Sequence, residues 1–480
     1  MSHDRYEMVI GLEVHVQLKT RTKAFCACAA DFGAPPNTNV CPVCLALPGS
    51  LPVLNQRAAV LATSAALALG ATVHEESVFA RKNYFYPDLP KGYQISQFDR
   101  PLATNGTLVI GERGDGAPHA IGITRLHLEE DAGKSIHDRY PGATAIDLNR
   151  CGVPLIEIVS EPDLRSAAEA GAYLRHLKLV LEYLEVSDAN MEEGSLRVDA
   201  NVSARPHGAM AFGTKTEIKN MNSFSGVERA LEAEFARQCA VLDRGERVVQ
   251  QTMLWDADRA EVRPARSKEG SHDYRYFPDP DLPPLRFTRV WIDEQCDRLP
   301  ELPAARRARF RREFALTAYD ADVLTASRAL AEYFEAVARA HGDARASAHW
   351  IMGEVLAVLN ASGIAIEQFM VAPSDLAALL DLIRAGTVSH GAAKSVFAAM
   401  RETGEAPRAV AEREGLLQVG DDDQLAQWVA EVFAENGDEG RRFLDGEKKL
   451  LGVLVGLVMK KSKGRADPKK VNQLISGRPR

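Results

Sequence analysis

The chain has 480 residues, and this length predicts two to four domains rather than one hydrophobic core. A net charge of −8 excludes a surface that is basic throughout, but it leaves room for a local basic patch that binds phosphate groups. The longest apolar stretch, residues 450–459, falls short of the ~20 residues of a membrane span, and the first residues lack the apolar core of a signal peptide. We therefore expect a cytoplasmic protein without membrane contact.

The first predicted element is a strand over residues 8–18. Apolar and polar residues alternate from Leu12 onward, so Glu13, His15 and Gln17 are expected on one face and the aliphatic side chains on the other. A carboxylate and an imidazole two residues apart on a strand are suited to metal binding or to acid–base chemistry. Taken alone, the alternation is more typical of an ordinary half-buried strand whose polar face meets water.

Four of the seven cysteines form two close pairs, Cys26 with Cys28 and Cys41 with Cys44. Each pair can hold one side of a metal ion, and the intervening loop closes a tetrahedral site of four thiolates. Such a site is saturated, so we expect a structural zinc over residues 26–44 rather than a catalytic one. The alternative is four unrelated thiols; the odd cysteine count argues against a disulfide framework.

Short alternating runs with Gly, Pro, Asn and Asp between them predict a strand-rich α+β domain over residues 1–298. Strands are expected at 122–128, 154–159 and 194–203, and helices at 55–69, 166–184 and 225–244.

Residues 81–97 combine cations, amides and aromatic rings, and Lys82, Tyr84 and Lys91 are the candidates there for contact with a nucleic-acid substrate. A surface hairpin with packed aromatic rings would have the same composition.

Further along the chain, acidic residues suggest a magnesium site. Three consecutive carboxylates begin with Glu129 and Glu130. Their negative charges repel one another unless a positive group is nearby. Glu157 is a lone acid in an apolar strand and must face solvent, a partner or a metal. Singly, each is more often an ordinary surface or strand acid. Together with Glu13 and His15 they supply the oxygen-rich coordination that phosphoryl transfer uses.

After residue 298 the composition changes to Ala, Leu, Arg and Glu with helical spacing. We expect an all-α helical domain over 299–405 and a small helical tail domain over 406–480. Helices are predicted at 304–314, 321–340, 347–360 and 373–385. The end of the chain is basic from residue 447 onward. No G-x-x-x-x-G-K-[ST] motif occurs, so a nucleotide would have to bind through another scaffold.

Five segments together resemble the B subunit of tRNA-dependent amidotransferases, the GatB/GatE family; they are residues 13–17, 81–87, 127–134, 155–163 and 194–201. The resemblance extends from about Tyr6 to Leu474, and residues 330–478 resemble the helical region shared with YqeY-type proteins. It implies a cradle-like catalytic domain followed by a helical domain and a mobile helical tail.

The resemblance also implies a function. In that family the B subunit uses ATP and Mg²⁺ to phosphorylate the side-chain carboxylate of Glu-tRNA(Gln) or Asp-tRNA(Asn). A glutaminase A subunit supplies ammonia through a channel, and a small C subunit clasps the two. The chain is therefore expected to be part of a carbon–nitrogen ligase with glutamine as amido-nitrogen donor.

When the family's functional positions are carried over residue by residue, the resemblance implies three sets of site residues in this chain. The catalytic candidates are Glu13, His15, Glu129, Glu130 and Glu157. The magnesium candidates are Glu13, His15, Glu130 and Glu157. The tRNA-binding candidates in the basic end are Lys460, Lys461, Lys463, Lys469 and Lys470. Only some family members have four such cysteines, so the zinc prediction rests on the cysteines themselves.

Two other hypotheses remain open at this point. The chain could be a non-catalytic tRNA-binding scaffold whose acids hold a structural cation, or a metal-dependent hydrolase that acts alone. A scaffold would keep the complex active after Glu13→Ala or Glu130→Ala, whereas a hydrolase would turn over without a partner.

Overall fold

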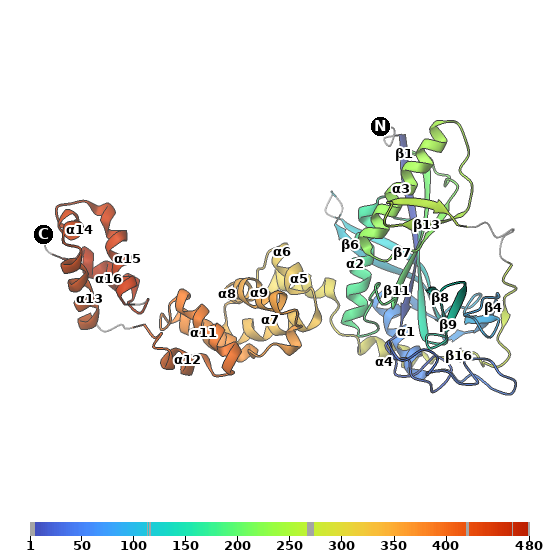
Figure 1. The fold of residues 1–480 in the computed structure, drawn as a ribbon, viewed down its shortest axis with the longest axis horizontal. Coiled ribbons are helices and arrows are strands. Elements are labelled where there is room, and N and C mark those ends of the chain that lie inside the picture. The colour runs from blue at the N-terminus through green and yellow to red at the C-terminus, as the bar shows by residue number, and fades with distance from the viewer. Residues whose placement is uncertain are drawn as a thin grey trace. The chain divides into compact units, whose positions relative to one another are not determined.

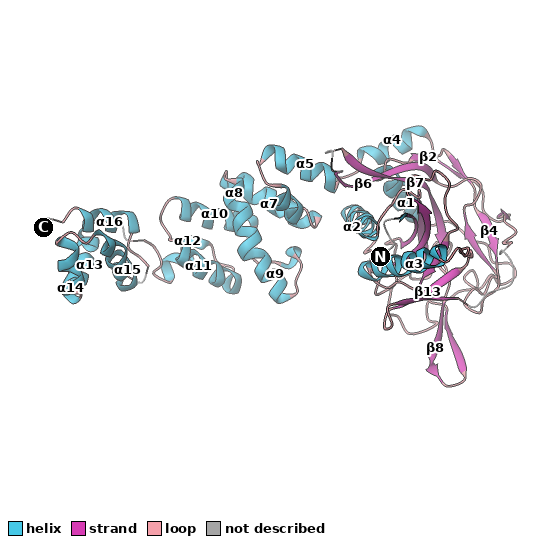
Figure 2. Cartoon of the chain, turned by 90° about the horizontal axis from the view of Figure 1, so that it is seen from above, coloured by secondary structure: helices cyan, strands magenta, loops and turns pink. Residues whose placement is uncertain are grey.

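The computed structural model describes residues 5–112, 114, 117–265, 273–418, 422–462 and 464–478. It divides into two compact units, Met1–Pro303 and Ala304–Arg480. The described strands all belong to the first unit, and the second unit is helical (Figure 2). The α+β fold class expected from the sequence is confirmed.

A mixed sheet of nine strands forms the framework of the first unit (Figure 1). Its central strand, β1 (Tyr6–Gln17), pairs antiparallel with β10 (Pro154–Ser160) on one side and β11 (Leu196–Pro206) on the other. Beyond β10 follow β7 (Pro118–Glu130), β6 (Ala103–Glu112) and β2 (Thr72–Val73); beyond β11 follow β12 (Thr216–Lys219), β13 (Thr252–Asp256) and β14 (Glu261–Pro264). Segments far apart in sequence therefore meet side by side around β1.

Smaller sheets accompany this framework. A three-stranded sheet consists of β15 (Phe277–Pro278), β4 (Ala80–Asn83) and β5 (Tyr93–Ser96). Two strand pairs consist of β16 (Leu285–Arg286) with β3 (Glu76–Ser77), and β8 (Lys134–Tyr140) with β9 (Ala143–Asp147). Strand β5 packs against β7 of the large sheet, and Gln94 Nε2 donates to the Glu130 carbonyl at 2.7 Å. The small sheet is thereby tied to the end of β7.

The two faces of β1 have opposite character, as its sequence predicts. Leu12, Val14 and Val16 are at most 1% exposed, whereas Glu13 and His15 remain partly exposed on the other face. The apolar face is covered by α1 (Gln56–Ala68), α2 (Ala167–Tyr183) and α3 (Phe224–Asp243), which share one hydrophobic core with it. These helices confirm the three expected in this region, and each begins after a side-chain cap at Asn55, Ser166 or Ser223.

Helix α4 (Arg289–Asp297) ends the first unit, and α5 (Pro303–Glu313) follows it. The helix expected over 321–340 is two helices, α6 (Ala318–Leu324) and α7 (Arg328–His341), because Ser327 caps α7 by accepting the Leu330 N–H at 3.2 Å. The next expected helix contains a π-helical turn (Ile351–Val355) between α8 (Ala344–Trp350) and α9 (Leu356–Ser362).

The remaining helices are α10 (Pro373–Arg384), α11 (His390–Thr403), α12 (Pro407–Arg413), α13 (Asp422–Glu435), α14 (Gly437–Leu444), α15 (Leu451–Lys461) and α16 (Pro468–Ser476). Two apolar clusters hold the second unit together, one spanning Phe310 to Ala411 and the other spanning Leu425 to Ile475. The domain limits at 298/299 and 405/406 stay predictions. Among the described residues, no helix is both long and apolar enough to cross a membrane.

Candidate functional site

A row of charged side chains crosses the polar face of the large sheet. His15 on β1 lies opposite Glu157 on β10 and Arg197 on β11, and Glu157 lies opposite His127 on β7. Paired residues of antiparallel strands point to the same face. Glu129 lies two residues beyond His127 and therefore shares that face. Strand register thus gathers groups from four separate segments into one row.

This row forms the floor of a cavity of about 500 Å³. Lys82 of β4, Tyr84 just after it and Ser96 of β5 line its other side, together with Tyr274 and Tyr276. The cavity therefore lies between the polar face of the large sheet and the small three-stranded sheet.

Two imidazoles and two carboxylates are in direct contact on this floor. His15 Nε2 lies 3.3 Å from Glu157 Oε2, and His127 Nε2 lies 3.1 Å from Glu129 Oε1 and 3.4 Å from Glu157 Oε2. Ser96 Oγ donates to Glu129 Oε1 at 2.6 Å, which fixes the orientation of that carboxylate.

The two carboxylates keep their negative charge despite burial. Burial disfavours the ionised form of Glu157, but His127 and His15 hold its pKa well below the usual value. Burial likewise works against ionised Glu129, whose pKa is lowered by its hydrogen bond to His127. Burial alone would lower the pKa of His127, yet the charges of Glu157 and Glu129 raise this pKa to about 9. The floor thus combines two carboxylates with a protonated His127.

The floor has a donor set that fits a divalent cation. Ligand atoms of His15, Glu129 and Glu157 all lie within 4.8 Å of one another. Two ligands bound to Mg²⁺ at ~2.1 Å lie at most roughly 4.2 Å apart, so only a small inward movement would complete the contact. Two carboxylates leave the remaining positions of an octahedral ion to water or phosphate oxygens.

The structure brings together only part of the residue set expected from the sequence. Glu13 lines the cavity, but its Oε1 accepts a hydrogen bond from Asn201 Nδ2 at 3.0 Å. Glu130 does not line the cavity: it pairs with Lys91 and accepts the Ile95 N–H at 2.9 Å. Among the described residues, Glu129 rather than Glu130 joins the group that could hold an ion.

The expected substrate-binding residues lie in different environments. Lys82 Nζ faces the cavity, 5.0 Å from the centre of the Tyr274 ring, and Tyr84 Oη donates to Gln94 Oε1 at 3.2 Å. The Lys91 side chain is only 6% exposed and serves as an internal partner of Glu130.

In the basic end, Lys460 and Lys469 are exposed and Lys470 is half-buried. Lys461 pairs with Glu431 at 3.0 Å and with Glu435 at 2.6 Å. Lys463 lies outside the described residues.

Sequence reasoning missed His127 and Arg197 as members of the site. For His127 a signal existed, because it precedes Glu129 by two residues in an alternating strand and so shares its face. Arg197 is placed opposite His15 by the pairing of β11 with β1, and a pairing between such distant segments cannot be read from one sequence.

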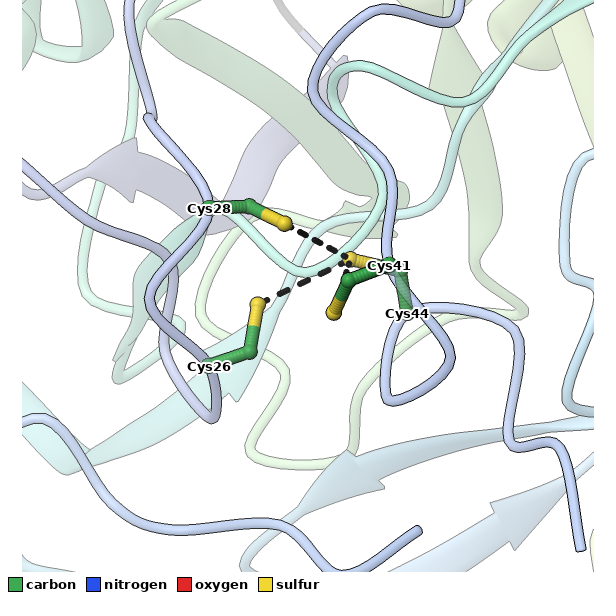
Figure 3. Close-up of side chains that lie close together, drawn as sticks. All are labelled: Cys26, Cys28, Cys41 and Cys44. Carbon is green, nitrogen blue, oxygen red and sulfur yellow. Dashed lines mark hydrogen bonds between the residues drawn. The ribbon is translucent and has the colours of Figure 1, made fainter.

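The four paired cysteines converge from two loops of the first unit (Figure 3). Cys44 Sγ lies 3.6 Å from Cys26 Sγ, 3.7 Å from Cys41 Sγ and 3.9 Å from Cys28 Sγ. Sulfurs bound tetrahedrally at a Zn–S distance of ~2.3 Å lie about 3.8 Å apart, so the spacing fits one ion. A hydrogen bond from Cys26 lowers the pKa of Cys44 to about 4 against the effect of burial. These cysteines form a candidate metal site.

Comparisons with known proteins agree with this architecture. Residues 8–293 match the GatB/GatE catalytic domain, and residues 332–478 match the GatB domain. Curated relatives include proteins from Chlorobium phaeobacteroides (strain BS1), 53% identical over 470 residues, and Geobacter sulfurreducens, 52% identical over 473 residues. Each alignment covers 98% of this chain and 98% of the relative, and both relatives are named as the B subunit of an aspartyl/glutamyl-tRNA(Asn/Gln) amidotransferase. The resemblance inferred from the sequence is confirmed, and the chain belongs to the GatB family of amidotransferase B subunits.

Proposed function

We propose that this chain activates the side-chain carboxylate of Glu-tRNA(Gln), Asp-tRNA(Asn) or both with ATP, and that ammonia then converts the activated group to the amide. The chain is a subunit of a carbon–nitrogen ligase with glutamine as amido-nitrogen donor. The observation that carries the proposal is the floor of His15, Glu129 and Glu157, which lies inside the segment that matches the catalytic domain.

The first step makes a poor electrophile reactive. A carboxylate oxygen of the tRNA-bound residue attacks the γ-phosphorus of ATP, the bond from that phosphorus to the bridging oxygen breaks, and ADP leaves with the electron pair. His15, Glu129 and Glu157 would hold Mg²⁺, which neutralises charge on the phosphates when bound. Lys82 faces the same cavity and carries a positive charge: burial works against this charge, but Glu129 raises the pKa of Lys82. It is the candidate for contact with a phosphate.

In the second step ammonia attacks the carbonyl carbon of the acyl phosphate. The carbon–oxygen bond to phosphate breaks, and the departing phosphate takes one proton from nitrogen, which leaves the neutral amide. Water would hydrolyse the same intermediate, so the site has to limit water access. The small sheet over the charged floor supports such shielding, because Ser96 and Gln94 contact Glu129 directly.

The remaining parts of the chain have supporting roles in this proposal. The four-cysteine site holds a structural zinc, and the lysines of the basic end contact the body of the tRNA. A glutaminase A subunit and a small C subunit complete the complex, and the reaction takes place in the cytoplasm. The relatives are named as B subunits, and this supports a complex of several different chains.

The test is amide formation by the complex of this chain with its co-purified partners, measured on each mischarged tRNA with and without ATP. The proposal predicts ATP-dependent conversion of at least one of the two substrates and no product from the chain alone. Turnover by the chain alone would favour a hydrolase. A complex that forms amide without consuming ATP would contradict the proposed activation step.

A further inference from the structure

An exposed aromatic ring stands at the cavity. Phe98 follows β5 and lines the cavity, and its ring stacks on Tyr276 with the centroids 4.1 Å apart and the planes at 7°. Tyr276 covers one face of the Phe98 ring, yet Phe98 remains 51% exposed. The other face of the ring is therefore open to a flat ligand, and exposed aromatic faces are the usual platforms for nucleobases.

A cation, Arg125, lines the same cavity. Arg125 lies on β7 two residues before His127, on the face that carries the charged floor. Its side chain forms no hydrogen bond or ion pair with any residue that the structure describes, whereas Arg197 on the same floor pairs with Asp131 at 2.9 Å. A guanidinium left unpaired in a cavity is suited to a phosphate group.

Along β7, Arg125 lies four positions before Glu129, or about 13 Å of strand. Glu157 lies closer, because it pairs with His127 two residues along β7 from Arg125, but neither Glu129 nor Glu157 forms an ion pair with Arg125. The exposed ring of Phe98, the guanidinium of Arg125 and the acidic floor all border the same cavity.

We propose that Phe98 and Arg125 form a subsite for an adenosine 5′-phosphate group, with the base stacked on Phe98 and the phosphate paired with Arg125. The inference rests on the proposed function, whose two substrates both carry this group: ATP itself, and the 3′-terminal adenosine of the tRNA. Phe98 and Arg125 are positioning residues for whichever substrate occupies the subsite.

The binding test uses the purified complex and two fluorescent probes, the triphosphate of 2-aminopurine riboside and a tRNA with 2-aminopurine at its 3′ end. Stacking on Phe98 should quench one probe. Phe98→Leu keeps an apolar side chain but removes the ring, so it should abolish that quenching and weaken binding of that probe about tenfold. Phe98→Tyr should retain both. Arg125→Ala should weaken the same probe, and Arg125→Lys should recover part of the loss.

Kinetics then identify the source of the adenosine. If ATP occupies the subsite, Phe98→Leu should raise the KM for ATP and leave the KM for tRNA unchanged; if the tRNA end occupies it, the reverse should hold. Tyr319→Ala is the control, because this ring is 69% exposed and belongs to the second unit.

The subsite would be overturned if Phe98→Leu bound both probes with wild-type affinity. It would also be overturned if Phe98→Tyr and Phe98→Leu weakened probe binding equally. The fluorescence titrations need no turnover. A complex that binds the probes in the expected way but forms no amide would contradict the proposed function alone.

Discussion

His15 on β1 and Glu157 on β10 face each other across an antiparallel pair, with Nε2 and Oε2 3.3 Å apart. Neither residue is near the other in sequence, and the contact exists only because β10 returns beside β1 in this register. The same register brings His127 and Glu129 of β7 to the row. We propose that this row supports phosphoryl activation of a carboxylate.

Adjacent glutamates should behave differently when substituted. Glu129→Gln removes a charge from the cavity floor and should abolish amide formation, and the loss of stability should be smaller than for Glu130 because His127 keeps Glu157 as a carboxylate partner. Glu130→Gln leaves the buried ammonium of Lys91 without its carboxylate, so it should destabilise the fold, by about 3–5 kcal/mol. Chemical unfolding and transamidation of both variants separate these effects.

The added substitution Lys91→Met should recover part of the stability lost in Glu130→Gln. If the Glu130→Gln protein is as stable as the wild type but inactive, this prediction is wrong and Glu130 is a candidate metal ligand, as expected from the sequence.

Loss of metal from the four cysteines should lower the stability of the segment that leads into β10. Asn39 N donates to Asn149 Oδ1 at 2.8 Å, and Lys23 Nζ donates to the Leu148 carbonyl at 3.3 Å, so the cysteine loops hold the residues just before β10. Cys41→Ser should reduce bound zinc to a small fraction and lower the melting temperature by about 5 °C, as a loss of ~2 kcal/mol would.

Elemental analysis and thermal unfolding provide the measurements for this prediction. Cys296→Ser is the matched control, because Cys296 is exposed and outside the cluster. Stoichiometric zinc in Cys41→Ser would rule out the four-thiolate site.

Exposed lysines of the basic end should contribute to tRNA affinity. Deleting residues 447–480 would remove Leu454, Val458, Val471 and Ile475 from a hydrophobic cluster, so substitutions are the cleaner change. Lys460→Ala combined with Lys469→Ala should raise the KM for tRNA several-fold and reduce the salt dependence of binding by about one ion per lost phosphate contact.

Lys461→Ala is the comparison for this pair, because Lys461 already pairs with two glutamates. Glutaminase activity of the complex should not change in the double variant. A loss of glutaminase activity, or an unchanged KM for tRNA, would argue for a structural role of these lysines.

Much of the floor could be predicted from local patterns, because alternation along β1 places Glu13 and His15 on the face opposite the core. The choice between Glu129 and Glu130 could not be made in this way. They are neighbours at the end of β7, and only the pairing with β10 and the contact with β5 decide which one meets His15. The cysteine site was accessible to prediction because its ligands lie close together in the chain.

The most direct test supplies ammonium chloride in place of glutamine, so that only the activation and amidation steps are measured. The complex with Glu157→Gln is compared with Glu75→Gln, which changes an exposed carboxylate outside the cavity. We predict that Glu157→Gln lowers ATP-dependent amide formation by at least ~100-fold while tRNA binding and glutaminase activity persist. Wild-type amidation by Glu157→Gln would contradict the assignment of this row as the activating site.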